Sequence, residues 1–400
     1  MSEVSALPLE GIRVVDVATL AAAPWLACYL AEFGADVIKV EQPKVGDHLR
    51  RWGSSKDGEP LFWKSIARNK RSVTLNLRDR RGSELLMRLL ATADVLVENF
   101  RPGTLERWGL APDVLHRANP RLIIARVTGF GQTGPYRNRP GFGTLAEGLS
   151  GFAHLTGQPD GPPTLPNLLL ADGVAGLTGA YAVMLALYHR DARNGEGQVI
   201  DVSLCDPLLR LMEPALLDWD QLGINGERSG NRTPHVAPRN AYRCGDGSWV
   251  GLSASAQSIF QRLASAIGRP DLVADPRFAT NDARLANVED LDEIIAEWVG
   301  ARDREEVLRV METADVAMGP ILDPRSIYED PHFTGRESFL PVEDPHLGPM
   351  RLVNVVPRLS ATPGHVRTTG PDLGQHNAEV YGELGVGAEE LRRLAADGVV

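Results

Sequence analysis

The stretch that decides the fold is RVVDVATLAAAPWLACYLAEFGADVIKVE, residues 13–41. It opens with a β-branched run, Arg13–Ala18, that predicts a strand. Trp25–Phe33 follows with the apolar spacing of an amphipathic helix, and Gly34 closes it. Ala35–Glu41 is a second strand-forming run. A strand, a helix and a strand in this order imply two parallel strands joined by a right-handed crossover, and therefore an α/β fold with a parallel sheet.

Further apolar runs downstream extend this sheet. The predicted strands are Ser72–Leu77, Asp94–Phe100, Arg121–Thr128 and Gln198–Ser203. In an open α/β sheet, ligands bind beyond the carboxyl ends of the strands. Asn99 and Phe100 end one of these strands, and Arg101 and Arg107 follow, so cations are expected near this edge of the sheet.

The turn after the first strand argues against a nicotinamide dinucleotide. Glu41 ends the second strand, where an acid receives the ribose in dinucleotide-binding units. The phosphate-binding turn of those units is G-x-G-x-x-G, but here Leu20–Pro24 reads LAAAP. Without glycines the backbone cannot approach a pyrophosphate closely at this turn.

The order of predicted elements divides the chain into three segments. Residues 225–240 are polar and rich in turn formers, a hairpin is predicted over Ala241–Ser253, and helical patterns fill 256–314. We expect residues 1–224 to form the first part of a large domain, 225–330 a smaller α+β domain, and 331–400 a return to the large domain. A single helix is predicted over Asp206–Leu222, and Asp323–Gly348 is expected to be turn-rich.

Composition limits the function classes. The chain has 400 residues, 43% of them hydrophobic, as is usual for soluble globular proteins, and its net charge of −10 argues against nucleic acid as a partner. Cys28, Cys205 and Cys244 are far apart, which favours a reducing, cytoplasmic compartment and no cysteine metal site. The first eleven residues lack signal-peptide features. The apolar stretch after Asp172 is interpreted as a buried helix, shorter than a membrane span.

One segment reverses the overall charge. Lys44–Arg81 holds eleven Lys or Arg residues against four acids, a candidate anion site in an acidic protein. Trp52, Phe62 and Trp63 interleave with these charges and would offer stacking surfaces to an aromatic ligand. The alternative is an ordinary solvated basic face.

The stretch LLLADGVAGLTGAYAVMLALYHR, residues 168–190, holds the candidate nucleophile. Asp172 stands where an extended segment meets a helix, where a cap is the ordinary role of Asp and where the helix dipole favours the ionised form. Gly173, Gly176 and Gly179 each weaken this helix by about 0.8–1 kcal/mol, so a backbone or a ligand is expected to come close. An ionised carboxylate in such a niche is a candidate nucleophile.

Several motifs together resemble one family, the class III coenzyme A transferases, which include formyl-CoA and carnitine CoA transferases and α-methylacyl-CoA racemase. The resemblance runs nearly end to end. The motifs are LEGIRVVDV near the start, GADVIKVE at 34–41, GDHLRRWG at 46–53, NKRSVTLNL at 69–77, ADVLVENFRPG at 93–103, GFGQTGP at 129–135, TGQPDGPPT at 156–164 and the AD of 171–172.

The resemblance implies a fold, a chemistry and a set of contacts. It implies a Rossmann-like large domain with a smaller domain, an interlaced homodimer, and acyl-CoA and a carboxylic acid as substrates without a permanently bound cofactor or metal. Asp172 would be the catalytic carboxylate, forming first an acyl anhydride and then an aspartyl-CoA thioester. Gly129–Pro135 would line the approach to it. The CoA contacts would be Ala22, Leu75, Arg78, Asn99, Phe100 and Arg107.

Departures from the family pattern keep alternatives open. Formyl-CoA transferase has Arg at the position of Gln42 and Gln at that of Ala21, and its glycine-rich loop has no counterpart after Asn231, which argues against oxalate and formate as substrates. Lys44 is a candidate to replace the missing arginine. Phe142 stands where the racemase branch has a His, which argues against proton exchange at an α-carbon. His154 and His235 are candidate substitutes. The third alternative is a CoA-binding protein without activity, in which Asp172 only caps its helix.

Overall fold

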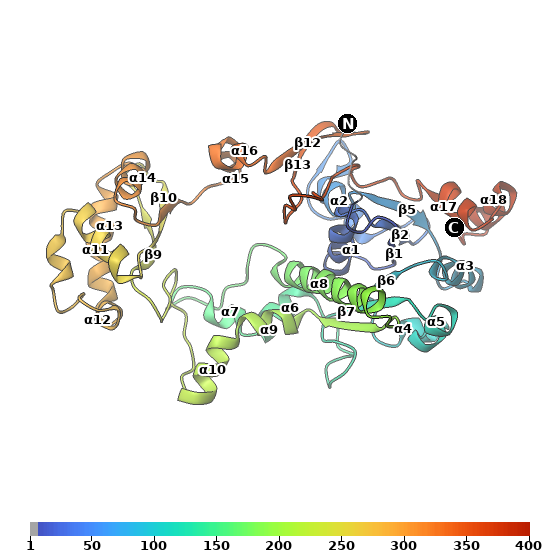
Figure 1. The fold of residues 1–400 in the computed structure, drawn as a ribbon, viewed down its shortest axis with the longest axis horizontal. Helices are drawn as coiled ribbons and strands as arrows, with labels where there is room; N and C mark the ends of the chain where they lie inside the picture. Colours follow the sequence, from blue (N-terminus) through green and yellow to red (C-terminus); the bar gives the residue numbers. More distant parts are fainter. Residues whose placement is uncertain (1–6) are drawn as a thin grey trace. The chain divides into compact units, whose positions relative to one another are not determined.

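The computed structural model describes residues 7–400, which form two compact units. The larger unit comprises 7–152, 165–222 and 337–400, and it is built on one parallel sheet of six strands (Figure 1). The sheet order is β5-β2-β1-β6-β7-β8. Its strands are β1 Arg13–Asp16, β2 Asp36–Glu41, β5 Lys70–Thr74, β6 Val95–Glu98, β7 Ile123–Thr128 and β8 Val199–Ser203.

This order confirms the parallel α/β sheet and locates its ligand crevice. From β1, the chain first adds strands on one side, β2 and then β5, and afterwards on the other side, β6, β7 and β8. Val15 on β1 therefore pairs with Ile38 of β2 and with Leu96 of β6. The direction of winding reverses between β1 and β6, and a crevice opens at such a point beyond the carboxyl ends of the two strands.

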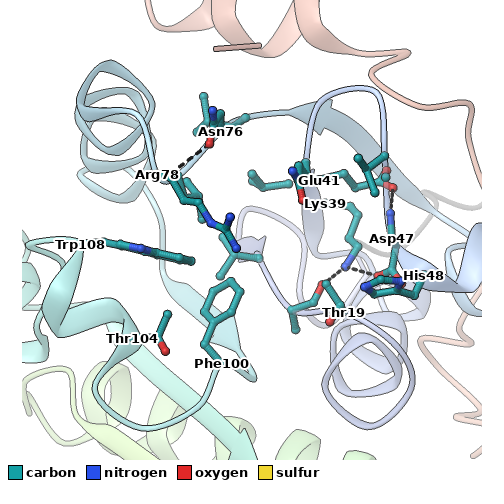
Figure 2. Close-up of a pocket in the computed structure, with 18 of the residues that line it drawn as sticks. Thr19, Lys39, Glu41, Asp47, His48, Asn76, Arg78, Phe100, Thr104 and Trp108 are labelled. Carbon is teal, nitrogen blue, oxygen red and sulfur yellow. Dashed lines mark hydrogen bonds and ion pairs between the residues drawn. The ribbon is translucent and has the colours of Figure 1, made fainter. Parts of the chain in front are cut away.

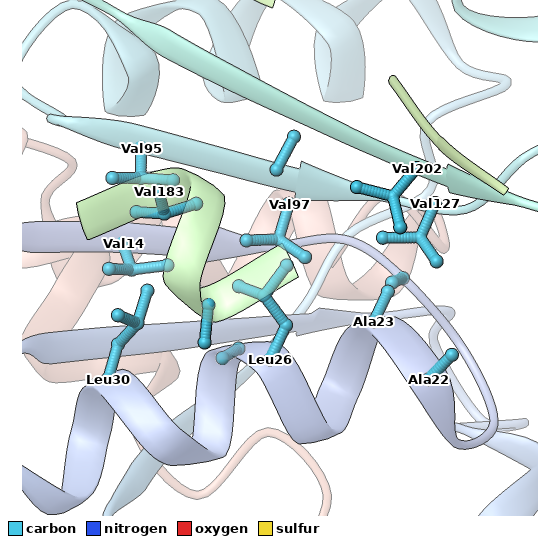
Figure 3. Packing of buried hydrophobic residues seen from close by; sticks show 14 of the residues in the cluster. Val14, Ala22, Ala23, Leu26, Leu30, Val95, Val97, Val127, Val183 and Val202 are labelled. Carbon is cyan, nitrogen blue, oxygen red and sulfur yellow. The ribbon is translucent and has the colours of Figure 1, made fainter. Parts of the chain in front are cut away.

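Helices cover both faces of the sheet. Successive residues of a strand point to opposite faces, so Val14 packs under α1 (Ala22–Glu32) and α8 (Leu170–Ala192), as Figure 3 shows. Val15 faces the other core, which is formed with α3 (Arg80–Leu90), α5 (Pro112–Ala118), α17 (Asn377–Glu383) and α18 (Ala388–Ala396).

The glycines of α8 allow α1 to run close beside it. A Cβ on Gly176 would lie 2.8 Å from the carbonyl oxygen of Ala22, and one on Gly179 would lie 2.5 Å from Cδ1 of Leu26. A Cβ on Gly173 would have no neighbouring atom closer than 3.8 Å. Two of the three glycines thus make room for a neighbouring helix, which brings the N-terminal ends of α1 and α8 together.

The α8 helix is longer and more exposed than the sequence indicated. At 23 residues it is the one helix among residues 7–400 that is long and apolar enough to cross a membrane, so the expectation of a shorter stretch was wrong. Only 44% of its most apolar window is buried. A single helix of this kind is weak evidence for a membrane span, because the core helices of soluble proteins can have the same length and composition.

The second unit comprises 153–164 and 223–336. Its antiparallel sheet has the order β11-β10-β9 and contains the predicted hairpin. Segment 153–164 belongs to this unit, and not, as predicted, to the large domain formed by the first 224 residues. The elements of the unit are α7 Phe152–Leu155, whose first residue belongs to the larger unit, β9 Arg239–Arg243, β10 Trp249–Ser253, α11 Gln257–Ala266, the 3-10 helix η2 Pro270–Val273, α12 Asn281–Ala286, α13 Val288–Gly300, α14 Arg304–Thr313, β11 Met318–Pro320, α15 Pro324–Glu329 and α16 Pro331–Gly335.

Two local predictions were wrong. The helix predicted over Asp206–Leu222 is two helices that break at Met212, because Pro214 has no N–H to continue the first helix. The region expected to be turn-rich contains α15 and α16, which begin at Asp-Pro pairs with Asp323 and Asp330 as side-chain caps. The other elements of the larger unit are the short 3-10 helix η1 His48–Arg51, the two-residue strands β3 Ser55–Lys56 and β4 Glu59–Pro60, the helices α2 Leu61–Ile66, α4 Thr104–Arg107, α6 Gly143–Leu149, α9 Cys205–Leu211 and α10 Glu213–Leu222, and the hairpin strands β12 Phe339–Asp344 and β13 Gly348–Val353.

Candidate active site

Three adjoining cavities lie at the crevice between β1 and β6. The first has a volume of about 360 Å³ and is lined by residues that follow β1, β2, β5 and β6. Figure 2 shows Arg78 reaching into it, with Phe100 and Trp108 on the same side and Lys39 and Asp47 opposite. The rings of Phe100 and Trp108 pack edge to face, with their centroids 5.0 Å apart. An aromatic pair beside an arginine suits a ligand that carries both a ring system and a phosphate.

The second cavity connects the first to Asp172. It shares Thr19, His48, Phe100 and Arg101 with the first cavity and reaches Asp172 at its far end. Its remaining lining includes Ala21, Ala22, Asn99, Gly129, Arg137, Arg139 and Phe142.

The third cavity begins at the same carboxylate. It shares Leu20, Ala21, Phe142 and Asp172 with the second, and it extends past Trp52, Thr144 and Glu147 to residues 165–169. Asp172 therefore borders two cavities, one of which leads back to Arg78.

Asp172 occupies the first turn of α8 but does not cap it. The N-cap is Leu169, which makes no side-chain cap hydrogen bond. The backbone N–H of Ala22, at the start of α1, instead lies on the same cavity wall and stabilises the ionised form of the Asp172 carboxylate. Two helix ends thus meet at one carboxylate.

The protonation of Asp172 is set by its surroundings. Burial, and after it the nearby Glu147 carboxylate, raise its pKa to about 6, and the Ala22 N–H opposes both. Glu147 is itself buried and accepts the N–H of Ala171 at 3.3 Å. The pKa therefore moves against the direction that a helix end alone favours, because burial and a like charge outweigh the dipole. At neutral pH the carboxylate is still mostly ionised, and it is poorly hydrated, which favours nucleophilic attack.

Glycine is needed beside this carboxylate. Gly143 is the first residue of α6, and a Cβ placed on it would collide with Oδ2 of Asp172. Phe142 precedes it and lines the second and third cavities, with 61% of its side chain exposed. A phenylalanine cannot exchange protons, so position 142 supplies no base to these cavities.

Asn99 holds the turn between β1 and α1. Its Oδ1 accepts the N–H of Thr19 at 2.9 Å, and its Nδ2 donates to the carbonyl oxygen of Thr19 at 2.6 Å. The next residue, Leu20, has φ +64°, a conformation that costs a leucine about 1–3 kcal/mol. The turn that leads to Ala22 is therefore strained, and its surroundings keep it in place.

Comparison with known proteins shows the family of this chain. The sequence pattern of CoA-transferase family III matches residues 9–377. The chain belongs to this family. It is 45% identical to the succinyl-CoA–D-citramalate CoA-transferase of Chloroflexus aurantiacus over 98% of both chains. It is 44% identical, again over 98% of both, to the β subunit of succinyl-CoA–L-malate CoA-transferase from that organism.

Solved structures have a similar fold. A CAIB/BAIF family protein from Brucella suis has a TM-score of 0.84 and 34% identity, covering 95% of this chain and 100% of its own. The protein is thus a family III CoA-transferase enzyme, and its substrates are CoA thioesters and carboxylic acids.

The predicted contact residues of the transferase do not all gather in the cavities. Leu75, Arg78 and Phe100 line the first cavity, and Ala22, Asn99 and Phe100 line the second. Arg107 lines neither, and its guanidinium donates to Oγ1 of Thr104 at 2.9 Å. Gln42 lines the first cavity, whereas Lys44 lines none of the three.

The loop expected to approach Asp172 contributes less than predicted. Of residues 129–135, only Gly129 lines the second cavity, and its Cα packs against Gly141. Arg137, Arg139 and Phe142 supply the lining instead. Sequence reasoning did not identify Glu147 or Asp47. Asp47 sits in the quoted GDHLRRWG motif, while no local pattern marks Glu147.

The basic segment of the transferase is mainly structural. Lys64, Arg68 and Lys70 are buried in ion pairs with Asp344, Glu32 and Asp16, respectively. Trp63 is 2% exposed, so it offers no stacking surface to a ligand. Most charges of the segment neutralise acids within the fold, and Arg78, which lines the first cavity, remains as its candidate contact to an anion. Among residues 7–400, no group of three or more His, Cys, Asp or Glu side chains is placed to hold a metal ion.

Proposed function

We propose that this transferase moves CoA from a dicarboxylic acyl-CoA such as succinyl-CoA to a second carboxylic acid through a covalent aspartyl-CoA on Asp172. The observation that carries the proposal is the position of Asp172, a half-desolvated carboxylate that borders both the second and the third cavity. The substrate class rests on the relatives, two of which are named for succinyl-CoA and for hydroxylated dicarboxylic acids.

The first half of the reaction loads CoA onto the enzyme. An oxygen of Asp172 attacks the thioester carbonyl carbon, the C–S bond breaks, and CoA leaves as a thiolate. The product is a mixed anhydride between the acyl group and Asp172. The thiolate then attacks Cγ of Asp172 and displaces the donor acid as a carboxylate, which leaves an aspartyl-CoA thioester.

The second half repeats these steps in reverse order with the acceptor. Its carboxylate attacks Cγ, forms a new anhydride and releases the thiolate, which attacks the acceptor carbonyl and restores Asp172. No proton is gained or lost overall. The Ala22 N–H lies where it would stabilise negative charge on the oxygens of Asp172 as each intermediate collapses.

The cavities suggest how CoA would lie. The adenosine and phosphates fit the first cavity, beside Arg78 and the Phe100–Trp108 pair, and the neutral pantetheine fits the second. Lys39 also lines the first cavity, but its Nζ lies 3.0 Å from Oδ2 of Asp47, so its charge is already balanced. Arg78 and Arg101 are the cations that remain for phosphate.

Two alternatives have weaker support. A racemase needs a base on each side of the α-carbon, and Phe142 supplies none. A CoA-binding protein without activity would use Asp172 as a helix cap, but Leu169 is the N-cap.

The assembly proposed is an interlaced homodimer in the cytoplasm. An apolar surface on α8 and α10 supports it, since patches of this kind are typical of subunit interfaces. Its exposed members are Leu177, Tyr181, Leu185, Tyr188, Leu217, Trp219 and Leu222. The three cysteines are free thiols, in keeping with a reducing compartment. Light scattering after size exclusion should give twice the chain mass of 43.4 kDa, and a monomer would contradict the dimer.

The reaction class can be tested in D₂O. Purified protein is incubated with succinyl-CoA and a free acid such as malate, and the thioesters are analysed by mass spectrometry. A transferase produces a new thioester without deuterium at the α-carbon. Deuterium in recovered thioester without a new one would favour the racemase, and binding with neither product would favour the inactive protein.

A further inference from the structure

Asp47 holds the turn that delivers Ala22 to Asp172. Leu20 has φ +64°, in the left-handed region that leucine rarely adopts. Oδ1 of Asp47 accepts the Leu20 N–H at 3.0 Å. Ala22 lies two residues further along, so a rotation at Leu20 changes where the Ala22 N–H points.

Asp47 is itself buried, hydrogen-bonded and ionised. It is 1% exposed, and its Oδ1 also accepts the N–H of Leu49 at 2.9 Å. Its own N–H donates to Oε2 of Glu41 at 2.8 Å. Burial opposes its ionisation, but the Lys39 ammonium and the N–H donors outweigh burial and hold its pKa below the usual range. Figure 2 shows Lys39 directed at Asp47, beside Thr19.

We propose that Asp47 is a positioning residue for catalysis: it keeps Leu20 in the left-handed conformation and so fixes the Ala22 N–H against the carboxylate of Asp172. This inference rests on the proposed role of Asp172 as nucleophile. Asp47 does not touch the reacting atoms, and it acts through two residues of backbone. If its acceptor oxygen is lost, the Ala22 N–H is no longer held in place, and the ionised form of Asp172 loses the stabilisation that this N–H provides.

The variants proposed below do not substitute the other charged residues near Asp172. Glu147 faces it from α6 and makes its own hydrogen bond to Ala171. The remaining charged or titratable side chains in the lining of the second cavity are His48, Arg101, Arg137 and Arg139. None of these residues is replaced in the variants, so a change in the pKa of Asp172 would indicate a change in the turn between β1 and α1.

The test compares Asp47→Ala with a matched control. Asp344 has the same kind of surroundings: it is buried, its Oδ1 accepts the N–H groups of His346 and Leu347, and Lys64 pairs with its Oδ2. Asp47→Ala should lower kcat about tenfold or more, with a smaller change in KM for succinyl-CoA. The acidic limb of kcat/KM should move up by about one pH unit, the effect of losing one donor to a carboxylate. Asp344→Ala should leave the limb in place.

Rescue separates positioning from folding. Asp47→Asn keeps an acceptor oxygen, so its limb should stay near that of the unaltered enzyme. Adding Leu20→Gly to Asp47→Ala should recover part of kcat, because glycine adopts φ +64° without strain. If Asp47→Ala does not fold, Asp47→Asn alone tests the proposal. An acidic limb of kcat/KM that moves to higher pH in Asp47→Asn would show that the charge of Asp47 matters and not its acceptor oxygen, and would contradict the proposed role.

An unmoved limb in folded Asp47→Ala, or an equal shift in Asp344→Ala, would overturn the role of Asp47. Activity in Asp172→Ala would instead overturn the proposed function, whatever Asp47 does.

Discussion

Gly143 and Asp172 approach each other so closely that no side chain fits at position 143: a Cβ there would collide with Oδ2 of Asp172. The start of α6 thus lies directly against the candidate nucleophile. Gly143→Ala should displace the carboxylate and lower kcat about 100-fold, the usual effect of moving a reacting group by about 1 Å.

Gly148 provides the control for this substitution. It lies in the same helix, and a Cβ there would meet nothing within 4 Å. Gly148→Ala should keep full activity and raise the free energy of unfolding by about 0.5–1 kcal/mol, because alanine favours the helix. Equal activity in the two variants would show that the close approach is unimportant for transfer. Steady-state kinetics and urea unfolding measure both effects.

Glu147 should control the pH dependence of transfer. Its carboxylate adds to burial in raising the pKa of Asp172 to about 6, so the acidic limb of kcat/KM should lie near that pH. Glu147→Gln removes the like charge while keeping an acceptor for the Ala171 N–H. The pKa of Asp172 then falls, and the limb moves to lower pH. A limb that stays in place or moves upward would be inconsistent with this electrostatic role.

The Asp172 carboxylate should lower the free energy of unfolding. A carboxyl group whose pKa rises on folding destabilises the folded state at pH values above its unfolded pKa. Asp172→Asn should therefore stabilise the protein by about 1–3 kcal/mol above pH 6, and the gain should vanish below about pH 4. Urea unfolding at several pH values tests this, and a gain that does not change with pH would argue against a raised pKa. The variant should have lost transfer activity.

Arg78 should bind the phosphate groups of CoA. It reaches into the first cavity, as Figure 2 shows, with no competing acid in the lining beside it other than Glu41 and Asp47, which bind Arg50 and Lys39. Arg78→Ala should raise KM for succinyl-CoA about tenfold with kcat nearly unchanged, the pattern of lost uniform binding. Arg80, which is exposed and pairs with Glu84 on α3, is the control. Equal KM values for the two variants would show that Arg78 does not bind CoA.

The fold was predictable because its signals are local. The β-branched runs and the amphipathic segment of residues 13–41 specify strand, helix and strand, and the right-handed crossover rule makes the strands parallel. The Asp-Pro pairs at 323 and 330 carried an equally local signal for two short helices, which the sequence analysis did not use.

The site was predictable only in part, because it is assembled from distant segments. Asp172 and Arg78 were found through motifs, and the structure places both in adjoining cavities. Glu147 raises the pKa of a residue 25 positions away, and no spacing rule reveals that contact. The ion pairs of the basic segment could not be predicted for the same reason, because the acidic partners, such as Asp344 for Lys64, lie far along the chain.

The most direct test of the account is to observe the covalent intermediate. The enzyme is mixed with succinyl-CoA in the absence of acceptor, quenched within the time of one turnover, digested and analysed by mass spectrometry. The account predicts CoA joined as a thioester to the peptide that contains Asp172, and a hydroxamate at the same residue after treatment with hydroxylamine. An active preparation with CoA attached to another residue, or with no covalent CoA at any time, would contradict it.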